Sequence, residues 1–365
     1  SGTVPDARFP ATLPAASGAN LTTLNASNLS SGTVGTARLG SGTASSSTFL
    51  RGDGSWQAVG TATGETYIRL KDAGGAASNT GINTYGGYNA GNSQGNAEGC
   101  TAIGRLAGED ITTANYSTFF GASAGQNVNT GGHNTAIGYE SLLSTTTGVA
   151  NTGVGSNTLR SNSSGEHNTA FGFYSLRSVT TGLRNTGIGS SAGQSVTTGS
   201  DNTYLGAYAG YSGSTGSQNT FVGKDAGYSI TTASENTALG YQALRSVQGG
   251  HNNVALGWKS LYSDTGGSFN IAIGTEALTS NTTKDGNIAI GYAALKTNTL
   301  GKENIAIGSQ SLEANSEGEY NIALGYKAGE AITTGDGNIT IGYNAGNDLT
   351  TANYNIFIGH EAGSQ

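Results

Sequence analysis

Apolar and polar residues alternate over short stretches that recur along the chain at a fixed interval. The nine letters NTAIGYESL begin at Asn134, and close variants begin at Asn236, Asn287 and Asn321. Within each stretch, β-branched or other large apolar residues stand at every second position before a glycine. This period-two alternation predicts a short β-strand and leaves no place for a helix.

The interval is seventeen residues, without insertion or deletion. A glycine holds this spacing at Gly87, Gly104, Gly121, Gly138, Gly155, Gly172, Gly189, Gly206, Gly223, Gly240, Gly257, Gly274, Gly291, Gly308, Gly325, Gly342 and Gly359. Such a period is typical of a solenoid, in which each repeat forms one coil stacked on the last. We therefore expect an all-β, parallel solenoid of seventeen 17-residue coils, each with two short strands and two turns. With strands about 4.8 Å apart, the rod would be about 80 Å long.

Stacking the coils turns each repeat position into a column. Asn stands four places before the glycine in fifteen coils, and Cys100 and Ser117 replace it in the other two. Stacked Asn side chains can hydrogen-bond to their copies in adjacent coils, so this column predicts a ladder that fixes the register. The structural ladder is represented by Asn134, Asn151, Asn168, Asn185, Gly138, Gly155, Gly172 and Gly189.

The alternation also divides each strand into two faces. The Thr or Ile column and the Ile, Leu, Val or Phe column, three and one places before the glycine, are expected to fill the interior. The Asn, Ala and Gly columns would then point outward and let another backbone approach, unless the glycine serves a corner with positive φ. Because one coil encloses few large apolar side chains and small cores are marginal, we expect several chains to associate through this small-residue face.

The N-A-I-G step resembles the head repeats of trimeric autotransporter adhesins, over residues 83–365. The resemblance implies a left-handed parallel β-roll in a homotrimer. Those heads usually have shorter coils, so a longer return loop is expected here.

Residues 1–60 have a different pattern. SGTVPDARFP at 1–10 returns as SGTVGTARLG at 31–40, followed by FLRGDGSWQ at 49–57. This block is similar to the shaft segments of bacteriophage tail fibres, many of which are homotrimers. We expect an extended fibre-shaft segment over 1–60, a capping segment over 61–82 and the β-roll over 83–365.

Composition and motifs disfavour several functions. The net charge of −7 and the pI of about 5.1 argue against a nucleic-acid partner, and no apolar stretch is long enough for membrane insertion. Hydrolase, metalloprotease and phosphate-loop signatures are absent, as is the calcium-binding GGxGxD repeat. We expect no enzyme activity, no cofactor and no metal, and Cys100 is interpreted as a small buried filler.

Three groups of residues are candidate binding sites. The residue after the repeat glycine is aromatic in eight coils and could stack on a glycan or form a solvent-facing edge: Tyr88, Tyr139, Phe173, Tyr241, Trp258, Tyr292, Tyr326 and Tyr343. His133 and His167 share a column about 10 Å apart, too far for one metal ion, and are interpreted as isolated surface residues. Arg51-Gly52-Asp53 matches an integrin-binding tripeptide, but a Gly-rich turn is the simpler interpretation.

These patterns favour a structural protein: a homotrimeric phage tail fibre, located on the virion, that spaces and presents a host-receptor-binding tip. Its partners would be copies of itself and a host glycan or protein. The alternative is a bacterial trimeric surface adhesin whose roll binds a host or matrix directly. A third hypothesis, ice binding, rests on the Thr-Thr pairs of eight coils. Because adjacent strand residues face opposite ways, such pairs would not form a flat array.

Overall fold

The computed structural model describes residues 48–50, 56–58, 68–72, 82–93 and 95–364. The chain divides into two compact units, residues 1–65 and 66–365. In the first unit, strands β1 (Thr48–Leu50) and β2 (Trp56–Ala58) form an antiparallel pair. Most of the predicted shaft, including the Arg51-Gly52-Asp53 tripeptide, lies outside the described residues.

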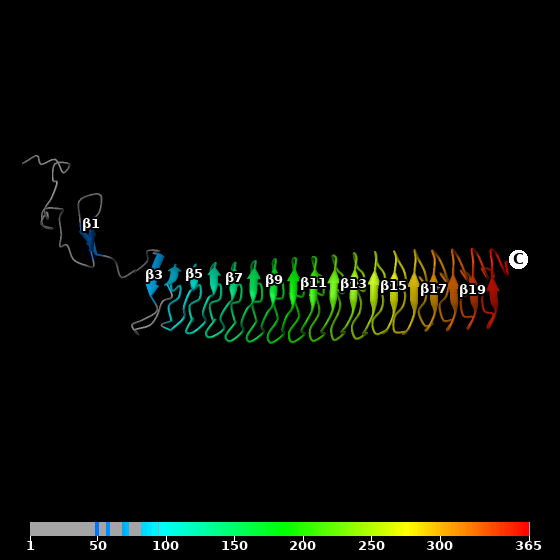
Figure 1. The fold of residues 1–365 in the computed structure, drawn as a ribbon, viewed down its shortest axis with the longest axis horizontal. Helices are drawn as coiled ribbons and strands as arrows, with labels where there is room; N and C mark the ends of the chain where they lie inside the picture. The colour runs from blue at the N-terminus through cyan, green and yellow to red at the C-terminus, as the bar shows by residue number, and fades with distance from the viewer. Residues whose placement is uncertain (1–47, 51–55, 59–67, 73–81, 94, 365) are drawn as a thin grey trace, which may run out of the picture. The chain divides into compact units, whose positions relative to one another are not determined.

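The second unit is a parallel β-solenoid of about sixteen turns, and its described residues contain no helix (Figure 1). Its strands are β3 (Ile68–Asp72), β4 (Ile82–Gly86), β5 (Thr101–Ile103), β6 (Thr118–Phe120), β7 (Thr135–Ile137), β8 (Thr152–Val154), β9 (Thr169–Phe171), β10 (Thr186–Ile188), β11 (Thr203–Leu205), β12 (Thr220–Val222), β13 (Thr237–Leu239), β14 (Val254–Leu256), β15 (Ile271–Ile273), β16 (Ile288–Ile290), β17 (Ile305–Ile307), β18 (Ile322–Leu324), β19 (Ile339–Ile341) and β20 (Ile356–Ile358). The prediction of an all-β, parallel repeat fold is confirmed.

The strands stack in strict register. Thr186 of β10 lies opposite Thr169 of β9 and Thr203 of β11, each one repeat away. β3 pairs antiparallel with β4, so it covers the edge of the first parallel strand, and β20 lies at the opposite end of the solenoid (Figure 1). No helix in the described part of the chain is long and apolar enough to cross a membrane.

From β5 onward each coil contains one three-residue strand, whereas two strands per coil were expected. A tight turn follows the repeat glycine, and a series of bends returns the chain to the next strand. Hydrogen bonds still join coils on this return side: the Leu142 N–H donates to the Thr158 carbonyl, and the Ser144 N–H to the Arg160 carbonyl, both at 3.0 Å. The return side is therefore held from coil to coil without the extended geometry of a second sheet.

The two faces of the strand are reversed from the prediction. Asn134 and Ala136 have no exposed surface, whereas Ile137 is 39% exposed and Thr135 is half-buried. The same pattern recurs along the solenoid, so the predicted apolar interior of Thr, Ile and Leu columns is wrong. The predicted outward placement of Asn and Ala is wrong for the same reason. The coil interior is narrow, and its inward-facing backbone groups require an amide partner, which Asn supplies.

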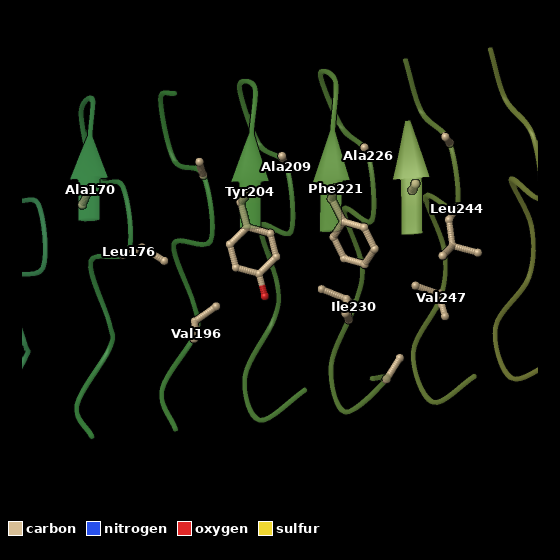
Figure 2. Packing of buried hydrophobic residues seen from close by; sticks show 14 of the residues in the cluster. Ala170, Leu176, Val196, Tyr204, Ala209, Phe221, Ala226, Ile230, Leu244 and Val247 are labelled. Carbon is tan, nitrogen blue, oxygen red and sulfur yellow. The ribbon is translucent and has the colours of Figure 1, made fainter. Parts of the chain in front are cut away.

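Two interior positions share the remaining space. Where Ala stands two places before the repeat glycine, Leu stands four places after it in many coils, as with Ala238 and Leu244. Where the first position is aromatic, the second is glycine, as with Phe221 and Gly227; a Cβ at Gly227 would lie 2.3 Å from the Phe221 ring. Figure 2 shows the Phe221 ring pointing into its coil. This exchange keeps the filled volume nearly constant, as close packing requires.

The repeat glycine serves a corner with positive φ, the second of the explanations offered for it, and it lies close to the backbone of the next coil of the same chain. Gly172 has φ +119°, which side-chain-bearing residues rarely adopt, and a Cβ there would lie 2.7 Å from the Gly189 carbonyl oxygen. The turn that follows is also left-handed: Tyr174 and Leu176 have φ +59° and +48°. Only glycine fits the first position, whereas the later ones accept other residues at a modest conformational cost.

Candidate binding surfaces and interior ladders

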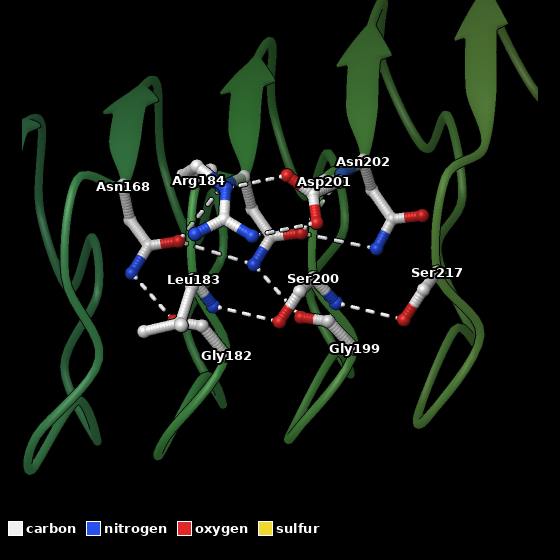
Figure 3. A network of polar contacts seen from close by, with 10 residues as sticks. Asn168, Gly182, Leu183, Arg184, Gly199, Ser200, Asp201, Asn202 and Ser217 are labelled. Carbon is white, nitrogen blue, oxygen red and sulfur yellow. Dashed lines mark hydrogen bonds and ion pairs between the residues drawn. The ribbon is translucent and has the colours of Figure 1, made fainter.

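The Asn column forms a buried hydrogen-bonded ladder. The Asn185 N–H donates to the Asn168 Oδ1 at 2.9 Å, and the Asn185 side-chain amide donates to the Gly199 carbonyl at 2.8 Å. Figure 3 shows the equivalent bond from the Asn168 side chain to the Gly182 carbonyl. Asn134, Asn151 and Asn202 repeat this pattern in their own coils. Each Asn side chain therefore accepts a hydrogen bond from the Asn of the next coil and donates one to the carbonyl of the turn that leads into that coil.

Two substitutions near the start of the ladder preserve part of this bonding. The Cys100 N–H donates to the Asn83 Oδ1 at 2.7 Å, and the Cys100 Sγ donates to the Ala114 carbonyl at 2.9 Å. The Ser117 Oγ accepts the Asn134 N–H at 3.1 Å. Burial raises the pKa of the Cys100 thiol, so this side chain is a protonated structural member of the ladder.

A second ladder, which the sequence interpretation missed, lies six places before the repeat glycine. The Leu183 N–H donates to the Ser200 Oγ at 3.0 Å, and the Ser200 N–H donates to the Ser217 Oγ at 3.1 Å (Figure 3). Here each backbone donor bonds to the side chain of the following coil, whereas in the Asn ladder it bonds to the preceding coil. Recurring Ser, Asp and Asn at this position was the available signal.

Among the described residues of the solenoid, Asp264 is a buried acid, which was also missed. Asp264 has no exposed surface, and its Oδ1 accepts the N–H groups of Gly266 and Gly267 at 3.2 and 2.7 Å. Its Oδ2 has no hydrogen-bond partner. Burial raises the pKa of the Asp264 carboxyl to about 7. In the same column, the next three coils carry Asn281, Asn298 and Asn315.

The histidines lie apart from any set of metal-binding groups. His133 and His167 are both exposed, and the His133 ring packs on Tyr116 with centroids 5.3 Å apart. Within the described ranges, no group of three or more His, Cys, Asp or Glu side chains could hold a metal ion.

The aromatic column after the glycine lies on the surface. All eight side chains are 41–66% exposed: Tyr88, Tyr139, Phe173, Tyr241, Trp258, Tyr292, Tyr326 and Tyr343. Some of them pack on neighbours, as Tyr326 does on Tyr343 with ring centroids 5.3 Å apart. The column therefore combines ring–ring packing with accessible aromatic faces.

The reversed strand leaves a second surface outside, which we term the outward sheet face. It consists of the side chains three and one places before each repeat glycine. In the first coils these are mostly Thr and a large apolar residue, and from β14 onward both are apolar. Every one of these side chains from β5 to β20 is at least partly exposed.

The Thr-Thr pairs do not lie on strands, so the expected alternation does not apply to them. They occupy bends, where Thr146 and Thr147 are both exposed. The first hydroxyl of the pair donates to the backbone of the next coil, as Thr146 Oγ1 does to the Ser163 carbonyl at 3.1 Å.

No family model, curated protein or solved structure matches this chain.

Proposed function

We propose that the chain is a structural fibre protein, a homotrimeric left-handed β-roll of a phage tail fibre that spaces and presents a host-receptor-binding tip. The outward sheet face is the observation that carries the proposal. Ile307, Leu239 and Phe171 on this face are 40%, 47% and 42% exposed. Contiguous apolar surface of this extent usually marks an interaction site.

The size of the outward sheet face supports association. Three-residue strands make it about 10 Å wide, and the stacked strands make it about 75 Å long, by the ordinary strand dimensions. The resulting area, about 750 Å², is close to the roughly 800 Å² that each partner contributes to a standard stable interface.

The regular spacing of the face favours further copies of this chain as the partner. A surface that repeats once per coil along the whole solenoid is best covered by another surface with the same repeat and length. Copies of this chain have both properties. Three chains follow from the resemblance to trimeric adhesin heads and fibres, with the outward sheet face in place of the small-residue face.

A mechanical role fits the interior. Backbone pairing connects each coil to the next, and the two side-chain ladders reinforce many of these connections, so bending the rod requires hydrogen bonds to be distorted at many coils at once. Such a solenoid would hold a tip at a fixed distance. A bacterial surface adhesin remains the alternative, and it would use the same trimer.

The mass of the purified chain in solution, by light scattering, tests the proposal. We expect three times the chain mass of 36.5 kDa. The double variant Ile290→Lys/Ile307→Lys places two charges on the outward sheet face and should yield monomers. Thr283→Lys, at an exposed position in a bend, is the matched control and should remain trimeric. A stable wild-type monomer, or equal dissociation of the control, would overturn the proposal.

Two further measurements separate the alternatives. Antibody labelling of intact phage particles along the tail supports the fibre, whereas labelling of bacterial cell surfaces supports the adhesin. Thermal hysteresis of the purified chain tests ice binding. We expect none, because the first hydroxyl of each bonded Thr-Thr pair already donates to a backbone carbonyl of the next coil.

A further inference from the structure

Aromatic and basic side chains gather on one edge of four consecutive coils, beside the sheet. We term this group the aromatic–basic edge: Tyr211, Tyr228, Arg245, Trp258, Lys259 and Tyr262. They stand one, two or five places after the repeat glycine, and these columns lie side by side along the turn. Four coils span about 14 Å by the ordinary strand spacing.

The rings and cations of the edge contact one another. Tyr211 and Tyr228 stack with centroids 5.0 Å apart. The Arg245 guanidinium lies 4.8 Å from the centre of the Tyr228 ring and 5.8 Å from that of Tyr262. The Lys259 Nζ lies 4.7 Å from the Trp258 ring and 5.5 Å from the Tyr262 ring. These contacts hold the cations in place without neutralising them.

The cations of the edge differ from two others in the column of Arg245, which are paired with acids. Arg160 pairs with Glu140 at 2.6 Å, and Lys296 pairs with Glu276 at 2.8 Å. Among the described residues, neither Arg245 nor Lys259 lies in an ion pair.

The acid expected to pair with Arg245 is directed elsewhere. Asp225 stands at the position equivalent to Glu140 and Glu276, but its carboxylate pairs with Lys224 at 3.7 Å. Three cations and one carboxylate therefore share this region, which leaves a local excess of two positive charges on a chain whose net charge is −7. The Arg245 Nε is buried without a hydrogen-bond partner.

We propose that the aromatic–basic edge binds an acidic polysaccharide. The exposed ring of Trp258 can stack on the apolar face of a sugar, and the partly exposed Arg245 and Lys259 can bond to carboxylate or sulfate groups. Each coil offers the same columns to the next, so a linear chain of sugars can lie along the solenoid axis. The inference rests on this edge alone and does not depend on the number of chains.

The test measures binding of the purified chain to polygalacturonate, heparin and neutral dextran by calorimetry at low and high salt. We expect binding to at least one acidic polymer, none to dextran, and weaker binding at high salt. Polygalacturonate and heparin separate a carboxylate ligand from a sulfate ligand. A DNA duplex is included, and tighter binding to DNA than to either polysaccharide would overturn the proposal.

Matched variants locate the site. Arg245→Gln/Lys259→Gln and Trp258→Ala should each weaken binding at least tenfold. Lys296→Gln removes the charge of a cation that is already paired with Glu276. Tyr292→Ala removes an aromatic residue that stands in the column of Trp258 but outside the aromatic–basic edge. Both control variants should bind the polysaccharide normally. Circular dichroism verifies that each variant is folded, and the Trp258 variant alone suffices if loss of Arg245 disrupts folding. Absence of binding to both acidic polymers, or equal losses in the controls, would refute the proposal while leaving the oligomer mass measurement unaffected.

Discussion

Replacing Asp264 by asparagine should stabilise the solenoid at neutral and alkaline pH. The carboxyl is buried in a column where three later coils carry Asn, and its Oδ2 has no partner. In that column the Asn298 side-chain amide donates to the Gly301 carbonyl three residues later, at 2.8 Å. An asparagine introduced in place of Asp264 could make the same bond to the Gly267 carbonyl, and its amide carries no charge to desolvate.

The pH dependence follows from the direction of the pKa shift. Burial raises the pKa of Asp264 from its ordinary value of 3.8 to about 7, so the folded chain holds this proton more tightly than the unfolded chain. The contribution of Asp264 to stability is fully present below about pH 4 and is lost as the pH rises towards 7, because ionisation in the folded state is costly. A difference of roughly three pKa units corresponds to a loss on the order of 4 kcal/mol.

Denaturant unfolding of wild type and Asp264→Asn at pH 4.5 and pH 8 measures this difference. The variant should resemble wild type at the lower pH and unfold at a clearly higher denaturant concentration at pH 8. Asp336→Asn is the matched control, because it removes the same charge about four coils away, from a partly exposed position whose Oδ1 accepts the Glu319 N–H at 2.8 Å. Equal pH dependence in wild type and Asp264→Asn would refute the argument that a buried carboxylate limits stability.

Three other substitutions test the interior. Phe221→Ala should lower the free energy of unfolding by about 3–5 kcal/mol. Adding Gly227→Leu should restore part of this loss, because it recreates the Ala–Leu arrangement of other coils. Additive losses in a double-mutant cycle would contradict this expectation. Gly172→Ala should lower the free energy of unfolding by about 3 kcal/mol or more, because alanine is strained at the positive φ of this position and its Cβ would clash with the Gly189 carbonyl of the next coil. An unchanged melting temperature would contradict this expectation. Asn185→Ala should lower the free energy of unfolding by about 3 kcal/mol, because it leaves the Gly199 carbonyl and the Asn202 N–H without their side-chain partner. Amide hydrogen exchange should increase first in the coils around Asn185 and Asn202, and unchanged protection there would argue against the ladder.

The sequence by itself determined the period, the strand positions and the stacking register. Seventeen-residue spacing without insertions leaves a single way to superpose the coils, and the A-I-G step places a strand before every glycine. It also indicated that the Asn column stacks on itself, because a ladder needs the same residue at every level. These features depend on spacing along the chain, which sequence records directly.

Only the tertiary structure decided which strand face is interior. Alternation shows that Thr135 and Ile137 share one face and Asn134 and Ala136 the other, but it does not say which side the coil closes around. A 17-residue coil with left-handed corners has a narrow interior that holds only one or two large apolar side chains, and its inward backbone groups need the Asn amides. The large apolar columns are therefore left outside. The positions of Arg245 and Asp264 likewise depend on neighbours a full repeat or more away, which become adjacent only when the coils stack.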